Sequence, residues 1–324
     1  MKNFLLLLAP LFLLFSCRKD DDAQGVSKSE YKQKMRDLVM NISRYAKSVN
    51  PDFLIVPQNG IELVSSSAED PVQPHAAYLD AIDAIGQEDL LYGYDNDNQV
   101  TSADRTNYLM NYLNIAKDAG KQILVTDYCF TPSKMDRSYQ ENNKYGFISF
   151  AADQRELTGI PAYPFQPNNE NTNNIYAIKQ AANFLYLLNT ENFTGRSLFI
   201  DALQETNYDV LIIDSYFTDG TAFTPTDIIK LKRKKNGGRR LVISYMCIGE
   251  AENYRYYWKD EWKVNKPNWM GSENPDWPGN FKVKYWDPEW QQILFGNDNS
   301  YIKKIADAGF DGAYLDIIDA FEYW

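Results

Sequence analysis

The chain has 324 residues, of which 44% are hydrophobic, 15% aromatic and 24% charged, a composition that is typical of a folded globular protein and excludes long disorder. Its 33 Lys and Arg residues against 44 Asp and Glu residues give a net charge of −11, which argues against a nucleic-acid-binding protein because such proteins need a basic face. The single His excludes a zinc site built from several imidazoles, and three Cys without a C-x-x-C pair exclude a disulfide scaffold and a Cys-type zinc site.

The first 17 residues predict a lipoprotein signal peptide. A short positive start, Met1–Asn3, precedes the apolar run Phe4–Phe15, which is too short to span a bilayer comfortably. The sequence Leu14-Phe15-Ser16-Cys17 resembles a lipobox, so we expect cleavage before Cys17, lipidation of Cys17 and a polar tether over residues 18–26. An ordinary secretory signal that contains a Cys is the alternative. The lipid would anchor the protein to the membrane of a bacterial cell envelope, outside the cytoplasm, at the outer membrane or the cell surface.

Residues 27–324 alternate between strand and helix patterns and predict a single α/β domain. Eight short apolar runs, each bounded by turn residues, are typical of parallel strands that are buried on both faces. They cover residues 53–56, 89–92, 122–126, 146–150, 184–188, 209–213, 241–245 and 312–315. Helical patterns over 103–119, 225–235 and 301–308 separate several of these runs. The alternation predicts a (β/α)8 barrel; a doubly wound sheet is the second choice, because no Gly-rich phosphate loop follows any strand.

The two ends of this pattern depart from a standard barrel. A helix predicted over 27–50 begins with Ser27 and Glu30 at capping-box spacing, and no strand precedes it. At the other end, the strand that ends at Leu315 has no helix after it. The final β/α unit is therefore split between the termini. We expect a circularly permuted barrel, in which the first helix covers the last strand.

Carboxylates follow most of the predicted strands, and the carboxyl ends of the strands are where a barrel carries its active site. The polar residues at these positions are Gln58, Asn59, Asp127, Tyr128, Asp214, Glu250, Glu252 and Asp316, and Glu88 lies at the edge of its strand. A ring of unpaired carboxylates costs stability through desolvation and repulsion, so it favours a functional role. Glycoside hydrolysis needs two carboxylates, one to donate a proton and one to act as base or nucleophile. Hydrolysis assisted by Mg²⁺ or Ca²⁺ is the competing use of such a ring.

All seven Trp residues lie between Trp258 and Trp324, mostly in the long connection after the seventh predicted strand. Aromatic rings cover the apolar faces of sugars, and they also fill cores. Most of these Trp residues are expected to pack this connection against the rest of the domain. We expect one or two to line a sugar site, and Trp286 is the candidate.

Three motifs carry a family resemblance. The runs Ile248–Arg255, Trp277–Asn280 and Gly309–Asp316 resemble the endo-α-1,4-polygalactosaminidase family of glycoside hydrolases, family 114. The resemblance covers nearly the whole chain after the signal peptide, but in swapped order: residues 184–316 resemble the first half of the family, and the segment from the first helix through Phe147-Ile148 resembles its second half. This order agrees with the permuted barrel.

The resemblance implies a catalytic pair, with Asp316 as nucleophile or stabilising carboxylate and Glu88 as general acid/base; the exchanged roles stay open. It also implies that five further residues bind substrate or tune the pair: Asp214, Tyr245, Glu250, Asp127 and Tyr128. The function implied is an endo-acting hydrolase of an amino-sugar polysaccharide that works as a monomer without metal or other cofactor. An anionic protein suits a cationic galactosamine chain. A non-catalytic glycan-binding lipoprotein and a metal-dependent hydrolase are the alternatives. The exact sugar, its acetylation, its linkage and the anomeric outcome are left open.

Overall fold

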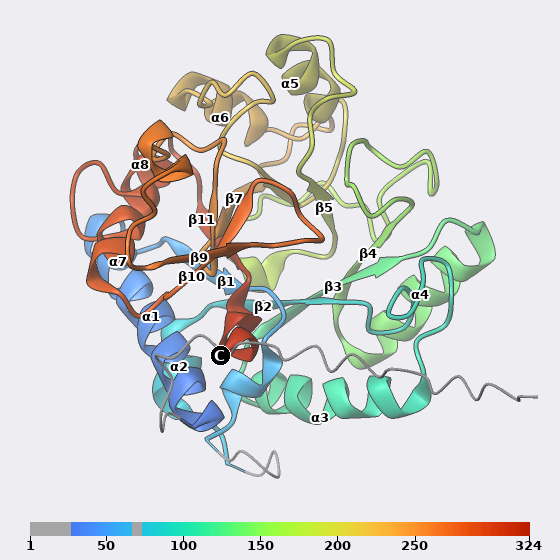
Figure 1. The fold of residues 1–324 in the computed structure, drawn as a ribbon. Helices are drawn as coiled ribbons and strands as arrows, with labels where there is room; N and C mark the ends of the chain where they lie inside the picture. The colour runs from blue at the N-terminus through green and yellow to red at the C-terminus, as the bar shows by residue number, and fades with distance from the viewer. Residues whose placement is uncertain (1–26, 67–72) are drawn as a thin grey trace, which may run out of the picture.

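The computed structural model describes residues 27–66 and 73–324 (Figure 1). The predicted signal peptide, Cys17 and the tether lie outside these described residues. In the part of the chain that is described, no helix has both the length and the apolar character needed to cross a membrane.

Parallel strands form the centre of the molecule. In the described residues the strands that pair in parallel are β1 (Leu54–Pro57), β2 (Ala84–Glu88), β3 (Gln122–Tyr128), β4 (Ile148–Ala152), β5 (Phe184–Leu187), β6 (Val210–Ile213), β7 (Leu241–Cys247) and β11 (Gly312–Asp316). One sheet has the order β1-β11-β7-β6-β5, and the other has the order β2-β3-β4. The expected α/β class with parallel strands is confirmed.

The edges of the two sheets lie against each other. Next to β1, Gln58 forms a parallel bridge with Gly86 of β2, and the Asn59 N–H donates to the Gly86 carbonyl at 2.8 Å. At the other pair of edges β4 contacts β5, where the rings of Phe150 and Phe184 lie 5.7 Å apart. Contacts therefore connect the two parallel sheets at both pairs of edges.

One of the predicted strands is wrong. Residues 89–92 do not form a strand; the strand is β2, five residues earlier, and Asp89 just after it has a positive φ of 58°. Its sequence, Ala-Ile-Gly-Gln-Glu, lacks the apolar run that identified the other strands. The reason lies in packing, because a Cβ atom at Gly86 would overlap the hydroxyl of Tyr314. The other seven predicted runs overlap observed strands.

Helices cover the outside of the strands. They are α1 (Lys28–Val49), α2 (Ala76–Ala81), α3 (Ala103–Asp118), α4 (Pro132–Tyr145), α5 (Arg196–Gln204), α6 (Pro225–Leu231), α7 (Pro288–Leu294) and α8 (Tyr301–Asp307). The predicted cap of α1 is present, because the Ser27 hydroxyl accepts from the Glu30 N–H at 3.3 Å. Between β4 and β5 the chain forms no α-helix; residues 153–183 make an irregular connection with one short 3₁₀ helix, η2 (Ile178–Gln180).

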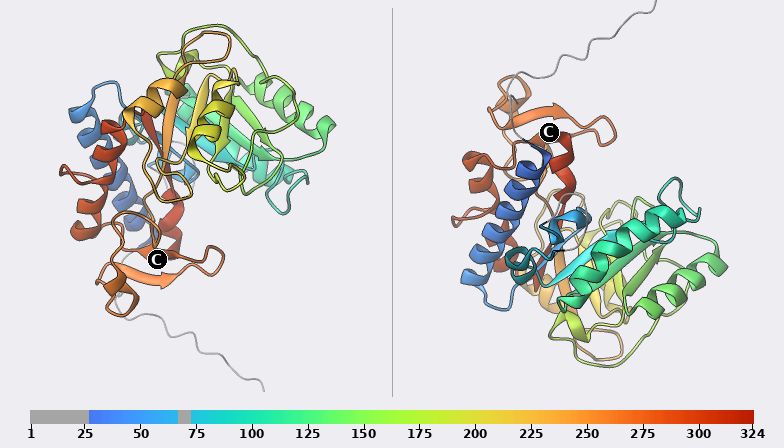
Figure 2. Two further views of the ribbon diagram at one scale, coloured as in Figure 1. Left: turned by 90° about the horizontal axis from the view of Figure 1, so that it is seen from above. Right: turned by 90° about the horizontal axis from the view of Figure 1, so that it is seen from below.

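The N-terminal helix lies beside the C-terminal segments (Figure 2). Helix α1 contacts α8 and the 3₁₀ helix η4 (Ile318–Tyr323) that follows β11. Two tyrosine hydroxyls also connect α1 to the C-terminal part of the chain. Tyr45 donates to the Asn297 carbonyl at 3.0 Å, and Tyr285 donates to the Tyr31 carbonyl at 2.8 Å. Strand β1 then pairs with β11, with Leu54 opposite Gly312. In space, the first helix and strand, α1 and β1, therefore lie next to β11 and the segments that flank it.

A small antiparallel sheet, which the sequence did not predict, follows β7 and lies in front of the parallel strands in Figure 1. It has the order β8 (Glu250–Glu252), β10 (Asn280–Val283) and β9 (Met270–Glu273), with the 3₁₀ helix η3 (Asp260–Lys263) between β8 and β9. The ring of Trp269 packs 5.2 Å from Trp262 and 5.0 Å from Trp290. These Trp residues pack the insertion against the α/β body.

Candidate active site

Glu88 and Asp316 are the last residues of β2 and β11, and β1 is the strand between them. A tyrosine holds each carboxylate. The Tyr128 hydroxyl donates to Glu88 Oε1 at 2.5 Å, and the Tyr245 hydroxyl donates to Asp316 Oδ2 at 2.8 Å. Asn59 Nδ2 donates to the other oxygen of Glu88 at 2.8 Å. The structure thus gives each member of the predicted pair a fixed orientation.

The two carboxyl groups influence each other electrically. Burial and then the negative charge of Glu88 raise the pKa of Asp316 to about 8, against the hydrogen bonds from Tyr245 and the Ile317 N–H. A second negative charge in a poorly hydrated site is unfavourable, so the pair retains a proton near neutral pH. The predicted pair is therefore brought together within electrostatic reach.

A layer of buried tyrosines surrounds the pair. Tyr128, Tyr186, Tyr245 and Tyr314 come from β3, β5, β7 and β11. The rings of Tyr186 and Tyr314 lie 5.3 Å apart, and the Tyr186 hydroxyl donates to Gln58 Oε1 at 2.9 Å. The Tyr314 hydroxyl has no hydrogen-bond partner among the described residues, and its pKa is raised by burial and then by the charges of Glu88 and Asp316. Sequence reasoning missed Tyr186 and Tyr314, although each lies inside a predicted strand.

Arg155 contacts the tyrosine that donates to Glu88. Its guanidinium lies 3.9 Å from the centre of the Tyr128 ring and donates to the Gly93 carbonyl at 2.9 Å. It also forms ion pairs with Asp89 at 3.1 Å and Asp97 at 2.7 Å. Burial nevertheless raises the pKa of Asp89 to about 7. Arg155 therefore fixes both Tyr128, which donates to Glu88, and the loop that follows Glu88. The sequence did not reveal this role.

Asp127 has a structural environment. It is completely buried, and Oδ1 accepts from the N–H groups of Leu91 and Tyr92 at 2.8 and 3.2 Å. Its other oxygen accepts from the Ser138 hydroxyl at 2.6 Å and from Asn142 Nδ2 at 3.1 Å. Because both oxygens are occupied, this geometry supports the tuning role that was expected of Asp127 as an alternative to sugar binding.

Arg255 joins two other predicted residues. It donates to Asp214 Oδ1 at 2.7 Å and to Glu252 Oε2 at 2.6 Å, so these carboxylates have a buried counter-charge. Glu250 differs. One of its oxygens accepts from Asn274 at 2.9 Å and from the Tyr323 hydroxyl at 2.7 Å, while Oε2 is buried and has no partner among the described residues. A Cβ atom at the neighbouring Gly249 would overlap the Ile317 carbonyl, so this glycine lets the segment after Asp316 pass closely.

Trp286 packs between the two ends of the chain. Its ring lies 5.2 Å from Tyr31, 4.9 Å from Tyr285 and 5.0 Å from Trp324, and the Lys34 ammonium lies 4.9 Å from the ring centre. These contacts place Trp286 in the packing of α1 against the C-terminus. The Trp286 side chain is partly exposed, and its role in lining a sugar site stays a prediction.

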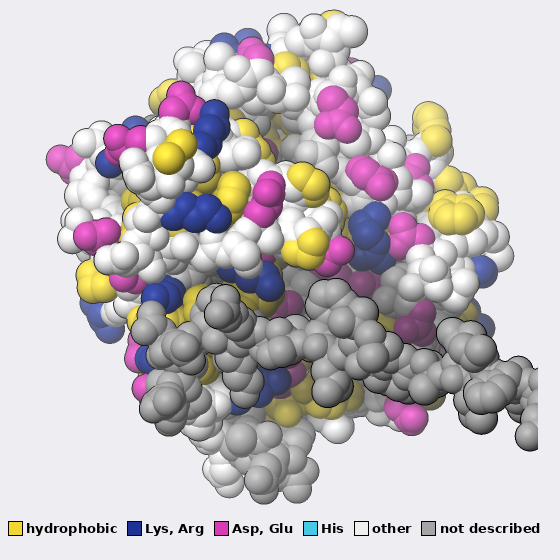
Figure 3. Space-filling view, viewed as in Figure 1, with side chains coloured by type: hydrophobic (Ala, Val, Ile, Leu, Met, Phe, Trp, Pro, Cys, Tyr) yellow, Lys and Arg dark blue, Asp and Glu magenta, His cyan; other side chains and the backbone are white. Residues whose placement is uncertain are grey.

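Figure 3 shows acidic side chains around a hollow beside the small antiparallel sheet. Within residues 27–66 and 73–324, no group of three or more His, Cys, Asp or Glu side chains is arranged to hold a metal ion.

The raised pKa of Asp316 predicts a pH-dependent stability. The folded protein keeps a proton on this group between its ordinary pKa of 3.8 and about 8, whereas the unfolded chain loses it. The unfolded state therefore binds fewer protons, so the contribution of Asp316 to stability falls as pH rises through this window, by up to about 1.4 kcal/mol per pH unit. Urea unfolding at pH 5, 7 and 9 should show Asp316→Asn gaining on the wild type as pH rises. An equal difference at all three pH values would contradict the raised pKa.

A pair of carboxylates at strand ends is an arrangement on which glycoside hydrolases rely. Residues 166–323, just under half of the chain, match the model of glycoside-hydrolase family GH114. The resemblance drawn from the three motifs is thereby confirmed. Asp316 lies inside the matched segment, and Glu88 lies outside it.

Three curated relatives were found, each an uncharacterised protein. One from Methanocaldococcus jannaschii is 42% identical over 160 residues, which is 48% of this chain and 42% of the relative. One from Thermotoga maritima is 42% identical over 122 residues, covering 38% of this chain and 36% of the relative. One from Deinococcus radiodurans is 39% identical over 123 residues, covering 38% and 37%. The matches thus span well under half the length of these curated relatives.

Proposed function

We propose that the chain is an endo-acting glycosidase that cleaves an amino-sugar polysaccharide with Glu88 and Asp316. The observation that carries this proposal is the coupled carboxylate pair, in which each member is fixed by a tyrosine hydroxyl at the end of a parallel strand. The match of residues 166–323 to the GH114 model supports the hydrolase class. The endo mode and the amino sugar rest on the resemblance to endo-α-1,4-polygalactosaminidases, and we further propose that the protein acts as a monomer.

The two parallel sheets are proposed to close as one circularly permuted (β/α)8 barrel over residues 27–324. The bridge between Gln58 and Gly86 and the contact of β4 with β5 support closure at both seams. The parallel pairing of β1 with β11, with α1 beside α8, supports the permutation. In this arrangement the helix that a standard barrel would place after its last strand is α1.

Two assignments of the roles stand for the pair. In the free site Asp316 retains a proton, which favours Asp316 as the acid. The resemblance implies the other assignment, in which Asp316 acts as nucleophile or stabilising carboxylate and Glu88 as general acid/base.

The test is digestion of partially deacetylated α-1,4-galactosamine polymer beside a panel of neutral and acidic glycans, read by mass spectrometry. We expect a ladder of oligosaccharides from the galactosamine polymer, unchanged by a chelator because carboxylates and tyrosines carry the chemistry. Loss of the products on chelation would favour a metal-dependent hydrolase instead. No product from any glycan, with binding retained, would overturn the enzymatic proposal in favour of a non-catalytic glycan-binding protein.

We also propose that Cys17 carries a lipid that anchors the protein to the bacterial envelope outside the cytoplasm. The lipobox-like sequence Leu14–Cys17 supports this. Expressed in a bacterial host, the wild-type protein should enter the detergent phase on detergent partitioning and Cys17→Ala should not. Equal partitioning of the two would contradict the anchor.

A further inference from the structure

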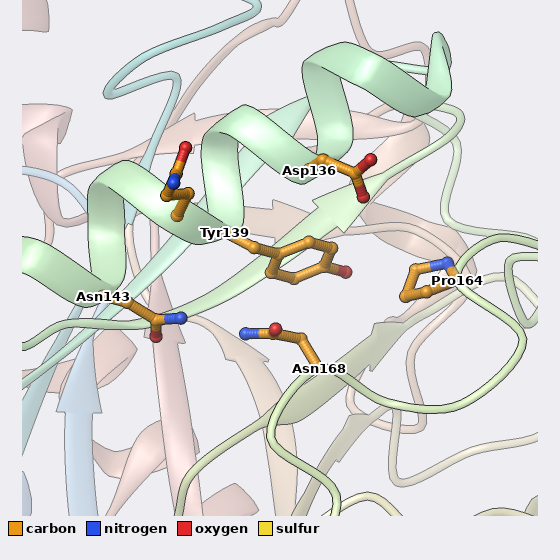
Figure 4. Close-up of a pocket in the computed structure, with 6 residues that line it drawn as sticks. Asp136, Tyr139, Asn143, Pro164 and Asn168 are labelled. Carbon is orange, nitrogen blue, oxygen red and sulfur yellow. The ribbon is translucent and has the colours of Figure 1, made fainter.

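A second hollow lies on the outer surface, along helix α4. It has a volume of about 420 Å³, within the range of small-molecule sites, and its lining comes from α4 and from the irregular connection between β4 and β5. Figure 4 shows Asp136, Tyr139 and Asn143 on α4 facing Pro164 and Asn168 on the connection; Gln140 completes the lining. We call this hollow the α4 groove. None of these lining residues is among those that contact Glu88 or Asp316 in the described structure.

Hydrogen bonds hold the two sides of the α4 groove together. On one side the Tyr163 hydroxyl donates to Asp136 Oδ1 at 2.6 Å, and on the other Asn169 Nδ2 donates to Asn143 Oδ1 at 3.1 Å. The Tyr139 ring lies between the helix and the connection, and its hydroxyl accepts from the Ala151 N–H at 3.2 Å. The groove is therefore a preformed feature of the fold, and both of its walls are tied in place.

Two carboxamides in the groove are free to bind a ligand. Gln140 is exposed and Asn168 is partly exposed, and neither side chain makes a hydrogen bond within the part of the chain that the structure describes. A carboxamide both donates and accepts, which suits the hydroxyl groups of a sugar. Two aromatic residues flank the lining residue Pro164 in the sequence: Phe165, whose side chain is 94% exposed, and Tyr163, which is 37% exposed. Exposed aromatic rings are the surfaces on which the apolar faces of sugars pack.

Charge narrows the class of ligand. Asp136 carries the only formal charge among the lining residues, so the groove does not favour an anionic ligand. We propose that the α4 groove is a second glycan-binding site, separate from the carboxylate pair, which holds a neutral or cationic stretch of polysaccharide. This rests on the proposed function for the identity of the polymer, but its binding chemistry is independent of hydrolysis. Binding away from the pair would keep a long polysaccharide near the enzyme between cleavage events. It would not affect short substrates.

The experiment measures binding and cleavage separately. Binding is measured by affinity electrophoresis in gels that contain the galactosamine polymer, chitosan or a neutral galactan, in an Asp316→Asn background so that the polymer stays intact. The groove variants are Gln140→Ala/Asn168→Ala and, independently, Phe165→Ala. The matched control is Gln292→Ala/Asn268→Ala, which removes two exposed carboxamides from α7 and from the residue before Trp269. In the otherwise wild-type enzyme, cleavage is measured on the polymer and on a short galactosamine oligosaccharide.

We expect the groove double variant to bind the polymer roughly tenfold or more weakly, because two hydrogen bonds are lost, with the control unchanged. Phe165→Ala should weaken binding in the same direction. Cleavage of the polymer should slow while kcat/KM on the oligosaccharide stays constant. Polymer binding that is the same in the double variant, or absent in the parent protein, would overturn the groove. If no glycan is cleaved but binding still depends on Gln140 and Asn168, the groove stands and the proposed hydrolase fails.

Discussion

Asp316→Asn and Glu88→Gln should each lower kcat/KM on the galactosamine polymer by at least about 10³-fold, the upper part of the range for one general acid/base group. Each change keeps the size of the side chain and its hydrogen bond from Tyr245 or Tyr128, so the fold should persist. Asp219→Asn is the matched control, because it removes an exposed carboxylate from the loop after β6 without touching the pair. Activity within tenfold of the wild type in either pair variant would contradict the assignment.

The same variants separate the two roles. A galactosaminide with a good leaving group needs no proton on the departing oxygen, so the general-acid variant should cleave it far better than the polymer, and added azide should restore turnover. The nucleophile variant should stay inactive on both substrates. If Glu88 is the general acid/base, as the resemblance implies, Glu88→Gln is the variant that is rescued. Rescue of Asp316→Asn instead would establish the exchanged roles, which the raised pKa of the free site favours.

Lys234→Met should have the largest effect on stability. The Lys234 ammonium and the Asp209 carboxylate lie 2.9 Å apart and both side chains are completely buried. The same ammonium donates to the Asn171 carbonyl at 2.9 Å, and Asp209 accepts from Asn171 Nδ2 and the Ala182 N–H, both at 2.8 Å. Removing the ammonium leaves a buried carboxylate without its counter-charge, which costs about 3–5 kcal/mol. Differential scanning calorimetry should show a Tm lower by roughly 6–10 °C.

The neighbouring residue supplies the control. Lys235 pairs with Glu205 at 2.9 Å, but the two side chains are 57% and 70% exposed. Such a surface pair contributes no more than about 1 kcal/mol, so Lys235→Met should shift Tm by roughly 2 °C or less. Adding Asp209→Leu to Lys234→Met should recover part of the loss, because no lone charge is then buried. Equal Tm values for Lys234→Met and Lys235→Met would refute the buried-pair argument.

How well the sequence predicts a strand depends on what the two faces of that strand contact. β6 and β7 are predictable because both faces are buried and all of their residues except Ser244 are apolar. β2 is not, because Gly86 has to clear Tyr314, a contact with a residue at the far end of the chain. The small antiparallel sheet was missed for a related reason: Met270–Glu273 is partly exposed, so its strand lacks an apolar run.

The candidate site divides in the same way. Asp316 and Glu88 were found through the resemblance to family 114, and Asp316 also follows a predicted strand. Arg155 was not found, because it acts on Tyr128 and Asp89 through space from the loop after β4.

Trp286 packs against α1, and its contact with a sugar stays a prediction, since aromatic content alone does not separate the two roles. Asp127 shows that a carboxylate next to the site can hold a loop in place, because it accepts from the Leu91 N–H.

The pairing of β1 with β11 also sets the order in which the protein is able to fold. β1 is made long before β11, so until β11 has been made β1 and β7 lack the strand that joins them. Pairing between such distant segments is slow, and open strand edges invite aggregation in the meantime. The carboxylate pair forms only when β11 is present, because β11 carries Asp316. Under the proposed function, a nascent chain therefore has no hydrolytic activity until β11 pairs between β1 and β7.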